Sequence, residues 1–243
     1  MKITDCPWEL ANLDCRVAEI SVPAGEVIDI SQVAELEKKY DYLVLKIQSG
    51  SMQNNIIAAE LGYILAETQM SLSKEKKDWH IDADPFVARL MPKLSVELIE
   101  SPQDFQELMD LFSDNMFSTD RIFLDPGFGP KFSSRRYKNW TRTEWERGTL
   151  LYKHFFGGKY VGYSLCRING DELICLLAGC FEKYQNSGIG FWIPLIPEIK
   201  GMPAYKKYSL KISSNNIPVW RLYDWQNYSV DRFEYVFVKH IEH

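Results

Sequence analysis

A polar turn with two glycines closely follows a long apolar stretch of the sequence. The stretch covers residues 173–181, and the turn reads Gln185-Asn186-Ser187-Gly188-Ile189-Gly190. Glycine has no Cβ, so the backbone N–H groups of such a turn can converge on a phosphate. A helix that begins at Gly188 would also direct the positive end of its dipole at the anion. The pattern predicts an anion-binding turn, although a plain surface turn explains two glycines equally well when the stretch is taken alone.

A second polar corner lies further along the chain, at residues 211–216. It reads as the end of a strand followed by a helix, because Pro218 suits a first helical turn and Asn215 or Asn216 can cap it. Tyr223 comes seven residues after Asn216, which places the two side chains two helical turns apart on one face. The corner therefore predicts an amide and a phenol that face the same side.

The two segments together resemble the GCN5-related N-acetyltransferase superfamily. The turn of that superfamily has glutamine or arginine, two spacers, glycine, one spacer and glycine, and residues 185–190 match every fixed position. Its later asparagine and tyrosine match Asn216 and Tyr223 in spacing. Where the superfamily then has glycine and phenylalanine, this chain has Asn227 and Tyr228. Asparagine is the non-glycine residue that best tolerates a left-handed backbone, so this departure is small.

Pro194 and Pro197 are a larger departure, because they lie in the segment that the superfamily makes a long helix. Proline removes a backbone donor and clashes with the preceding helical turn. We therefore expect this helix to be short, kinked or replaced by a loop, with its first turn retained.

The resemblance implies an α/β (α+β) fold, with a mixed, mostly antiparallel central sheet flanked by helices over residues 95–243. The sequence agrees, because three strand-like segments are joined by Gly157-Gly158 and Asn169-Gly170, which favour tight hairpins. These segments are residues 149–156, 159–168 and 171–181.

The N-terminal part alternates strand-like and helix-like segments, which predicts a partly parallel sheet. The segments are residues 16–22, 30–40, 42–48, 55–61 and 63–71. We interpret residues 1–75 as a smaller α/β domain, either a degenerate half-copy of the acetyltransferase domain or an unrelated extension. It lacks the glycine turn and a tyrosine in register, so one cofactor site per chain is expected. Residues 76–94 are predicted to link the two domains.

The resemblance implies that the chain binds acetyl-CoA. Backbone amides of the turn would hold the diphosphate, and the free edge of the preceding strand would bind the pantetheine amides. The cofactor-binding residues would be Leu177, Gly179, Cys180, Gln185, Asn186, Ser187, Gly188, Ile189, Gly190 and Asn216. Tyr223 would protonate the leaving thiolate, and a tyrosine that only packs its ring is the alternative. Asn216 would serve the fold almost as well as a simple helix cap.

The general base and the acceptor site are less well defined. His154 lies in a strand-like segment beside the expected cleft and has a suitable unperturbed acidity, although a lone strand histidine is more often a packed or surface residue. Glu182 acting through a water is the alternative. A loose similarity over nearly the whole chain connects it to acetyltransferases of dTDP-linked amino sugars. Arg135, Arg136 and Trp140 would then bind the nucleotide, although a plain amphipathic helix with solvated arginines explains them as well.

Composition limits the class of protein and its partners. The chain has 243 residues, of which 46% are hydrophobic and 25% charged, so it can fold around a substantial core. Its net charge of −5 and pI near 5.5 argue against nucleic-acid and anionic-membrane binding. The five cysteines are scattered and show neither metal spacing nor a disulfide framework. No apolar run is long enough to span a membrane, and the first residues lack the apolar core of a signal peptide.

We therefore expect a cytoplasmic, metal-independent N-acetyltransferase that acts on a small-molecule amine, most simply a nucleotide-linked amino sugar. A homodimer is compatible with this assignment. One alternative is an acetyltransferase for another amine, such as an amino acid, an antibiotic or a protein N-terminus. A contrasting alternative is a non-catalytic acyl-CoA-binding domain on the same scaffold.

Overall fold

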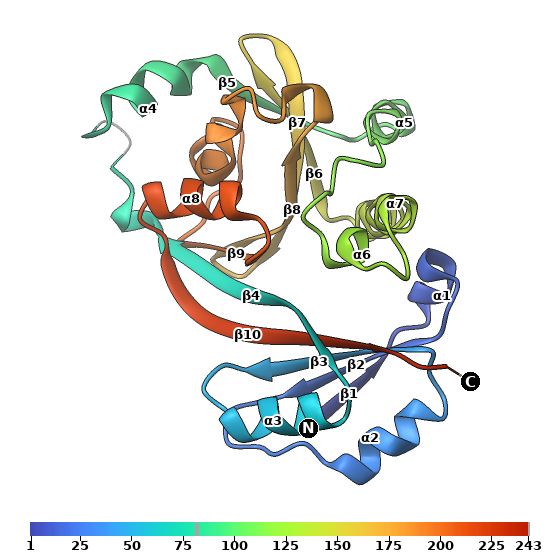
Figure 1. The fold of residues 1–243 in the computed structure, drawn as a ribbon. Helices are drawn as coiled ribbons and strands as arrows, with labels where there is room; N and C mark the ends of the chain where they lie inside the picture. Colours follow the sequence, from blue (N-terminus) through green and yellow to red (C-terminus); the bar gives the residue numbers. More distant parts are fainter. Residues whose placement is uncertain (81–82, 243) are drawn as a thin grey trace.

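A single ten-stranded sheet organises the molecule (Figure 1). The computed structural model describes residues 1–80 and 83–242. The strand order is β1-β2-β3-β10-β4-β9-β8-β7-β6-β5, so the last strand of the chain lies near the middle of the sheet. Within these described ranges, no helix is long and apolar enough to cross a membrane. The same ranges hold no group of three or more histidine, cysteine or acidic residues suited to a metal ion.

The described residues form strands, α-helices and 3₁₀ segments. The strands are β1 Lys2–Asp5, β2 Val17–Val22, β3 Tyr42–Gln48, β4 Ile64–Glu75, β5 Leu94–Leu98, β6 Leu150–Phe156, β7 Lys159–Asn169, β8 Glu172–Cys180, β9 Lys207–Ser213 and β10 Ser229–His240. The α-helices are α1 Trp8–Leu13, α2 Ile30–Glu37, α3 Met52–Glu60, α4 Pro85–Leu90, α5 Pro102–Asp110, α6 Arg121–Leu124, α7 Pro130–Glu146 and α8 Ile217–Trp225. The 3₁₀ segments are η1 Lys76–Asp78, η3 Met91–Lys93, η4 Glu182–Tyr184 and η5 Ile189–Glu198.

The chain builds one pattern twice. Two parallel strands are joined by a helical crossover, and a further helix then leads to a third strand. The N-terminal copy is β2, α2, β3, α3 and β4, and the C-terminal copy is β8, η5, β9, α8 and β10. β2 pairs with β3 in parallel, as β8 does with β9. The interpretation of residues 1–75 as a degenerate half-copy, or as an unrelated extension, stays a prediction.

The two copies exchange their third strands. β10 lies antiparallel between β3 and β4, and β4 lies antiparallel between β10 and β9. At the crossing, the fully buried Val236 of β10 is aligned with Lys46 of β3 on one side and Glu67 of β4 on the other. Each copy therefore completes its own part of the sheet with a strand of the other copy.

Helices cover both faces of the C-terminal part of the sheet. In Figure 1, α5, α6 and α7 lie on one side of β6 to β8, and η5 and α8 lie on the other. The first side buries Leu108 of α5 against Leu165 of β7, and the second buries Trp192 of η5 with Tyr208 of β9. The continuous apolar run at residues 191–197 explains why η5 is buried along most of its length.

The predicted fold class is confirmed, because the sheet is mixed, mostly antiparallel and flanked by helices. The predicted meander forms as β6, β7 and β8, with turns at the two expected dipeptides. The partly parallel N-terminal sheet also forms, as β2 beside β3. The sheet runs without a break across the proposed domain limits, and those limits stay a prediction.

Because each copy depends on a strand of the other, we expect the chain to unfold as one unit and not half by half. Amides of β3 and of β9 should exchange with deuterium through the same global opening, at the same free energy. Native-state hydrogen exchange at increasing denaturant concentration measures both values. A clearly lower opening free energy for β3 would show that the N-terminal copy unfolds independently.

Candidate functional site

A wedge-shaped opening between two parallel strands forms the centre of the site. β8 and β9 pair only over Glu172–Cys175 and Lys207–Leu210, although β8 continues to Cys180 and β9 to Ser213. Beyond Cys175, β8 pairs with β7 on one side, across a register shift at Leu176, and its other edge faces the opening. The corresponding strands of the N-terminal copy, β2 and β3, stay paired along the whole of β2. The opening therefore belongs to one copy of the pattern.

A cavity of about 580 Å³ extends from this opening, a size typical of small-ligand sites. The cavity brings together both segments that the sequence singled out. The predicted residues on its wall are Leu177, Gly179, Cys180, Gln185, Asn186, Gly190, Asn216, Tyr223, Arg136 and Trp140. Ser187, Gly188 and Ile189 belong to the same turn but lie off the wall, and His154 lies elsewhere.

The glycine turn is shaped by left-handed residues and a side-chain clamp. Asn186 has φ of 61° and Gly188 has φ of 78°, and Gln185 Nε2 donates to the backbone carbonyls of Met116 at 3.0 Å and Cys180 at 3.3 Å. Within the described part of the chain, the backbone amides of Asn186 and Gly188 make no hydrogen bond. A Cβ at Gly188 would meet no atom within 4 Å. Free amides beside open space fit a diphosphate.

The segment after the turn is a 3₁₀ helix, η5, and not a long α-helix. Gly188 caps its start, and Pro194 and Pro197 lie inside it. The Pro194 carbonyl accepts a hydrogen bond of 2.6 Å from the hydroxyl of Tyr228, the tyrosine that replaces the expected phenylalanine. The expectation drawn from the two prolines is confirmed, and the helix still begins at the turn.

Asn216 caps the start of α8, and Tyr223 lies in its last turn. Asn216 Oδ1 accepts a hydrogen bond from the Val219 amide at 3.3 Å, so the side chain caps the helix while it lines the cavity. Tyr223 is only 2% exposed, and burial raises the pKa of its phenol well above the usual value. The phenol therefore stays protonated at neutral pH. A protonated phenol on the wall of the opening can donate a proton to a group that binds there.

The two candidate bases lie in different surroundings. His154 is fully buried, shares a hydrogen bond of 2.7 Å between its Nε2 and Ser164 Oγ, and stacks on Trp192 with ring centroids 4.3 Å apart. Burial lowers the pKa of His154 to about 3, so its ring is neutral at physiological pH. Glu182 is exposed and accepts a long hydrogen bond of 3.4 Å from Asn115 Nδ2. These positions give a role as general base no support.

Of the residues predicted to bind a nucleotide, the two arginines form ion pairs within the protein, whereas Trp140 does not. Arg136 Nε donates to Glu9 Oε1 at 2.8 Å, and Arg135 bonds the Asn12 carbonyl at 2.7 Å and Asp14 at 2.8 Å. Both arginines therefore join α7 to α1. Trp140 lines the cavity and is partly exposed.

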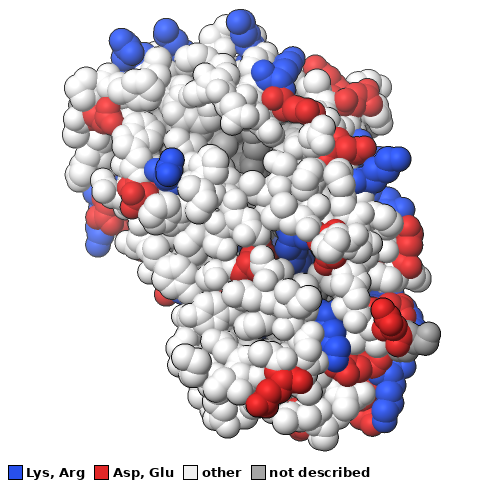
Figure 2. Space-filling view, viewed as in Figure 1, with Lys and Arg blue, Asp and Glu red and all other residues white. Residues whose placement is uncertain are grey.

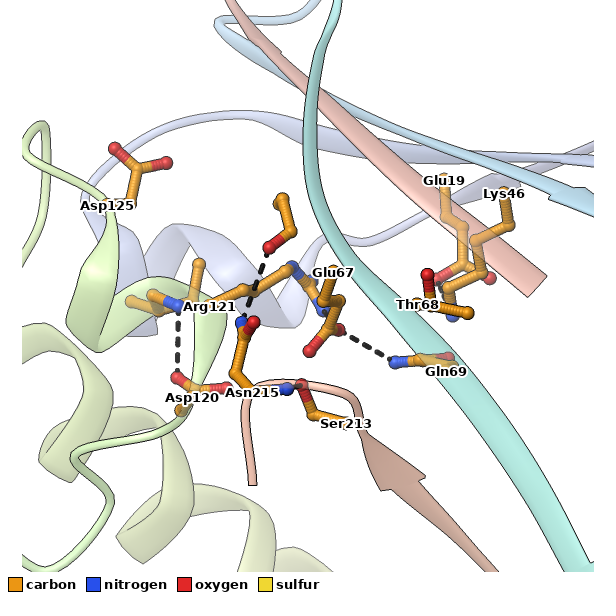
Figure 3. A network of polar contacts seen from close by, with 12 residues as sticks. Glu19, Lys46, Glu67, Thr68, Gln69, Asp120, Arg121, Asp125, Ser213 and Asn215 are labelled. Carbon is orange, nitrogen blue, oxygen red and sulfur yellow. Dashed lines mark hydrogen bonds and ion pairs between the residues drawn. The ribbon is translucent and has the colours of Figure 1, made fainter. Parts of the chain in front are cut away.

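A polar network that the sequence did not predict lies at the other end of the cavity (Figure 3). The residues of this network on the cavity wall are Glu19, Lys46, Glu67, Gln69, Asp120 and Arg121. They come from β2, β3, β4 and the start of α6, and the exchange of β4 and β10 brings them together. In the space-filling view, groups of both charges meet in the hollow between the lower and upper parts of the molecule (Figure 2). No local pattern in the sequence marks these residues, because their neighbourhood is created by strand order.

The chain matches known proteins by structure and not by sequence. No family model and no curated protein sequence matches the chain. A solved GCN5-related N-acetyltransferase from Sphaerobacter thermophilus aligns at 13% identity and a TM-score of 0.57, over 83% of this chain and 60% of its own. Another from Kribbella flavida aligns at 12% identity and a TM-score of 0.54, over 92% of this chain and 81% of its own.

A third structure, a tandem GNAT protein from the clavulanic acid biosynthesis pathway, aligns at 10% identity and a TM-score of 0.54, over 94% of this chain and 79% of its own. The chain has the GNAT fold. In this GNAT fold, the wedge between β8 and β9, the glycine turn and Tyr223 lie around one cavity.

The buried His154 gives the stability of this GNAT fold a specific pH dependence. Its pKa is about 3 in the folded chain against 6.5 when unfolded, so protons bind the unfolded state first as pH falls below 6.5. The contribution of the neutral His154 ring to the free energy of unfolding is therefore fully present above pH 6.5 and is lost progressively towards pH 3. At pH 5 the loss should be about 2 kcal/mol. Urea unfolding at pH 7.5 and pH 5 measures it, and His154→Gln should lose that much less than the native chain. Equal losses in the two proteins would contradict this assignment.

Proposed function

We propose that the chain is an acetyl-CoA-dependent N-acetyltransferase that acts on a small-molecule amine. The observation that carries the proposal is the opening between β8 and β9, which meets the glycine turn at one end and Tyr223 in α8. The opening offers the edge of β8 beyond its pairing with β9, the turn offers the amides of Asn186 and Gly188, and α8 offers a protonated phenol. The likeness to GNAT structures supports the proposal through the fold.

The chemistry asks little of the protein beyond placement, because the thioester of bound acetyl-CoA already supplies an activated acetyl group. The turn amides would hold the diphosphate, and residues 176–180 of β8 would bind the pantetheine by strand-like hydrogen bonds. Tyr223 would give its phenolic proton to the leaving sulfur. The proton that the attacking nitrogen loses would restore the phenol, so the residue ends as it began.

A nucleotide-linked amino sugar stays one proposed acceptor, supported by the position of Trp140 on the cavity wall. The decisive test is a screen of amines for release of free thiol from acetyl-CoA by the purified chain. The panel should hold dTDP-linked amino sugars, amino acids, aminoglycosides and peptides. Release with one class establishes the transfer reaction. Binding of coenzyme A without release for any amine would favour the non-catalytic alternative.

Gly188→Val should weaken coenzyme A binding by roughly a hundredfold, because a β-branched residue strains a left-handed turn and fills the space beside the free amides. Calorimetric titration measures the affinity and should give one coenzyme A per native chain, because only one copy opens. Gly25→Val is the matched control, since Gly25 has φ of 80° and open space at its Cβ but lies in the N-terminal copy. Equal affinities in the two folded variants, or two sites per chain, would refute the assignment.

Tyr223→Phe should lower the turnover number roughly a hundredfold or more, because one positioned proton donor is lost while the ring still packs. The Michaelis constants should change little, since the proton is transferred only in the transition state. Tyr228→Phe serves as control: it removes the hydrogen bond to the Pro194 carbonyl and should reduce stability more than turnover. Near-normal turnover in Tyr223→Phe would mean that solvent protonates the sulfur.

A further inference from the structure

A loosely coupled pair of buried opposite charges lies at the end of the cavity away from the glycine turn. Glu67 Oε1 accepts a hydrogen bond of 3.1 Å from Gln69 Nε2, and Arg121 Nη1 approaches the same oxygen only to 3.9 Å. The side chains of Glu67 and Arg121 are 4% and 11% exposed. Figure 3 shows Arg121 between Asp120 and Glu67, with Glu67 pointing towards Gln69.

Both members of this pair keep unused hydrogen-bonding capacity. Arg121 has five N–H donors, and its buried Nε finds no acceptor among the described residues. Glu67 Oε2 receives no hydrogen bond within the same described ranges, while its carboxyl lines the cavity. A buried donor without a partner costs stability, so a ligand that supplies the partner gains that free energy on binding.

The other charges at this end are already satisfied. Lys46 pairs with Glu19 at 2.7 Å, and Arg136 pairs with Glu9 at 2.8 Å. Asp120 accepts hydrogen bonds from Ser133 Oγ at 2.9 Å and the Ile122 amide at 3.1 Å. A ligand that brings one positive and one negative group leaves this balance intact, whereas a diphosphate would bury an excess of negative charge.

We infer that the acceptor is a small molecule that carries an amine and a carboxylate close together, as an α-amino acid does. Its ammonium binds the Glu67 carboxylate, and its carboxylate binds the Arg121 guanidinium, so the ligand enters between the two side chains. Before the nitrogen attacks, the ammonium releases one proton to water, and the second proton that the nitrogen loses restores the phenol of Tyr223. This inference rests on the proposed function for the identity of the reacting amine. Glu67 belongs to β4, so the N-terminal copy would supply acceptor recognition for a cofactor site in the C-terminal copy.

The test is calorimetric titration of the full chain, with and without saturating coenzyme A, using the standard L-amino acids and their primary carboxamides. Each carboxamide keeps the amine and side chain but loses the carboxylate. At least one amino acid should bind, and its carboxamide should bind roughly thirtyfold or more weakly, as expected when a buried charge loses its partner.

Variants assign the two charges. Arg121→Gln should abolish the preference for the acid over the carboxamide, and Glu67→Gln should weaken both ligands alike because both carry the ammonium. Arg16→Gln is a matched control, since Arg16 pairs with Asp41 at 2.6 Å outside the cavity, and it should keep the full preference.

Three results would overturn the inference: carboxamides that bind as well as acids, no binding by any amino acid, or binding by a dTDP-linked amino sugar in their place. The comparison of acids with carboxamides on the native chain tests the inference even if a variant fails to fold. Thiol release from acetyl-CoA, measured in parallel, tests the proposed function separately. Binding of an amino acid without thiol release would contradict the proposed transferase function and support the amino-acid site. Thiol release with carboxylate-free amines alone would support the transferase function and contradict the amino-acid site.

Discussion

The parting of β8 from β9 is the constraint on which the rest of the structure depends. Two parallel strands gain by pairing to their ends, so an opening between them persists only if each is held from outside. The end of β8 is held by β7, which pairs with it as far as Cys180. The end of β9 is held by β4, through the Gln69–Ser213 pair and a hydrogen bond of 2.8 Å from the Ser214 amide to the Thr68 carbonyl. The wedge is thus fixed by the strands on its two flanks.

The exchange of third strands connects this wedge to the polar end of the cavity. β4 starts in the N-terminal copy, supports β9, and carries Glu67 and Gln69 on the way. Asn215, at the corner before α8, donates to the Ala66 carbonyl at 3.3 Å, so the start of α8 is tied to the same strand. The N-terminal copy, which has no such opening, therefore positions β9 on one side of the opening through β4, and β4 also carries the polar side chains beside it.

What could be predicted from the sequence was local. The glycine turn, the two tight hairpins and the cap at Asn216 depend on residues a few positions apart, and their conformations followed from backbone chemistry. The effect of Pro194 and Pro197 on η5 followed in the same way. The surroundings of His154 could not be foreseen, because alternation along a strand does not tell which face Trp192 will cover. Glu67 and Arg121 come together only through the order of the strands, which no local pattern records.

The exchange also has a consequence for biosynthesis. On the ribosome, β2 and β3 are made early, but the edge of β3 stays unpaired until β10, which follows all the other strands in the sequence, has been made. Strand pairings between such distant segments form slowly, and an unpaired apolar edge such as Leu43-Val44-Leu45 can associate with other nascent chains. The synthesis of β10 thus decides when the edge of β3 is protected from aggregation, and a chaperone that shields β3 until then would bind a segment that the folded chain hides.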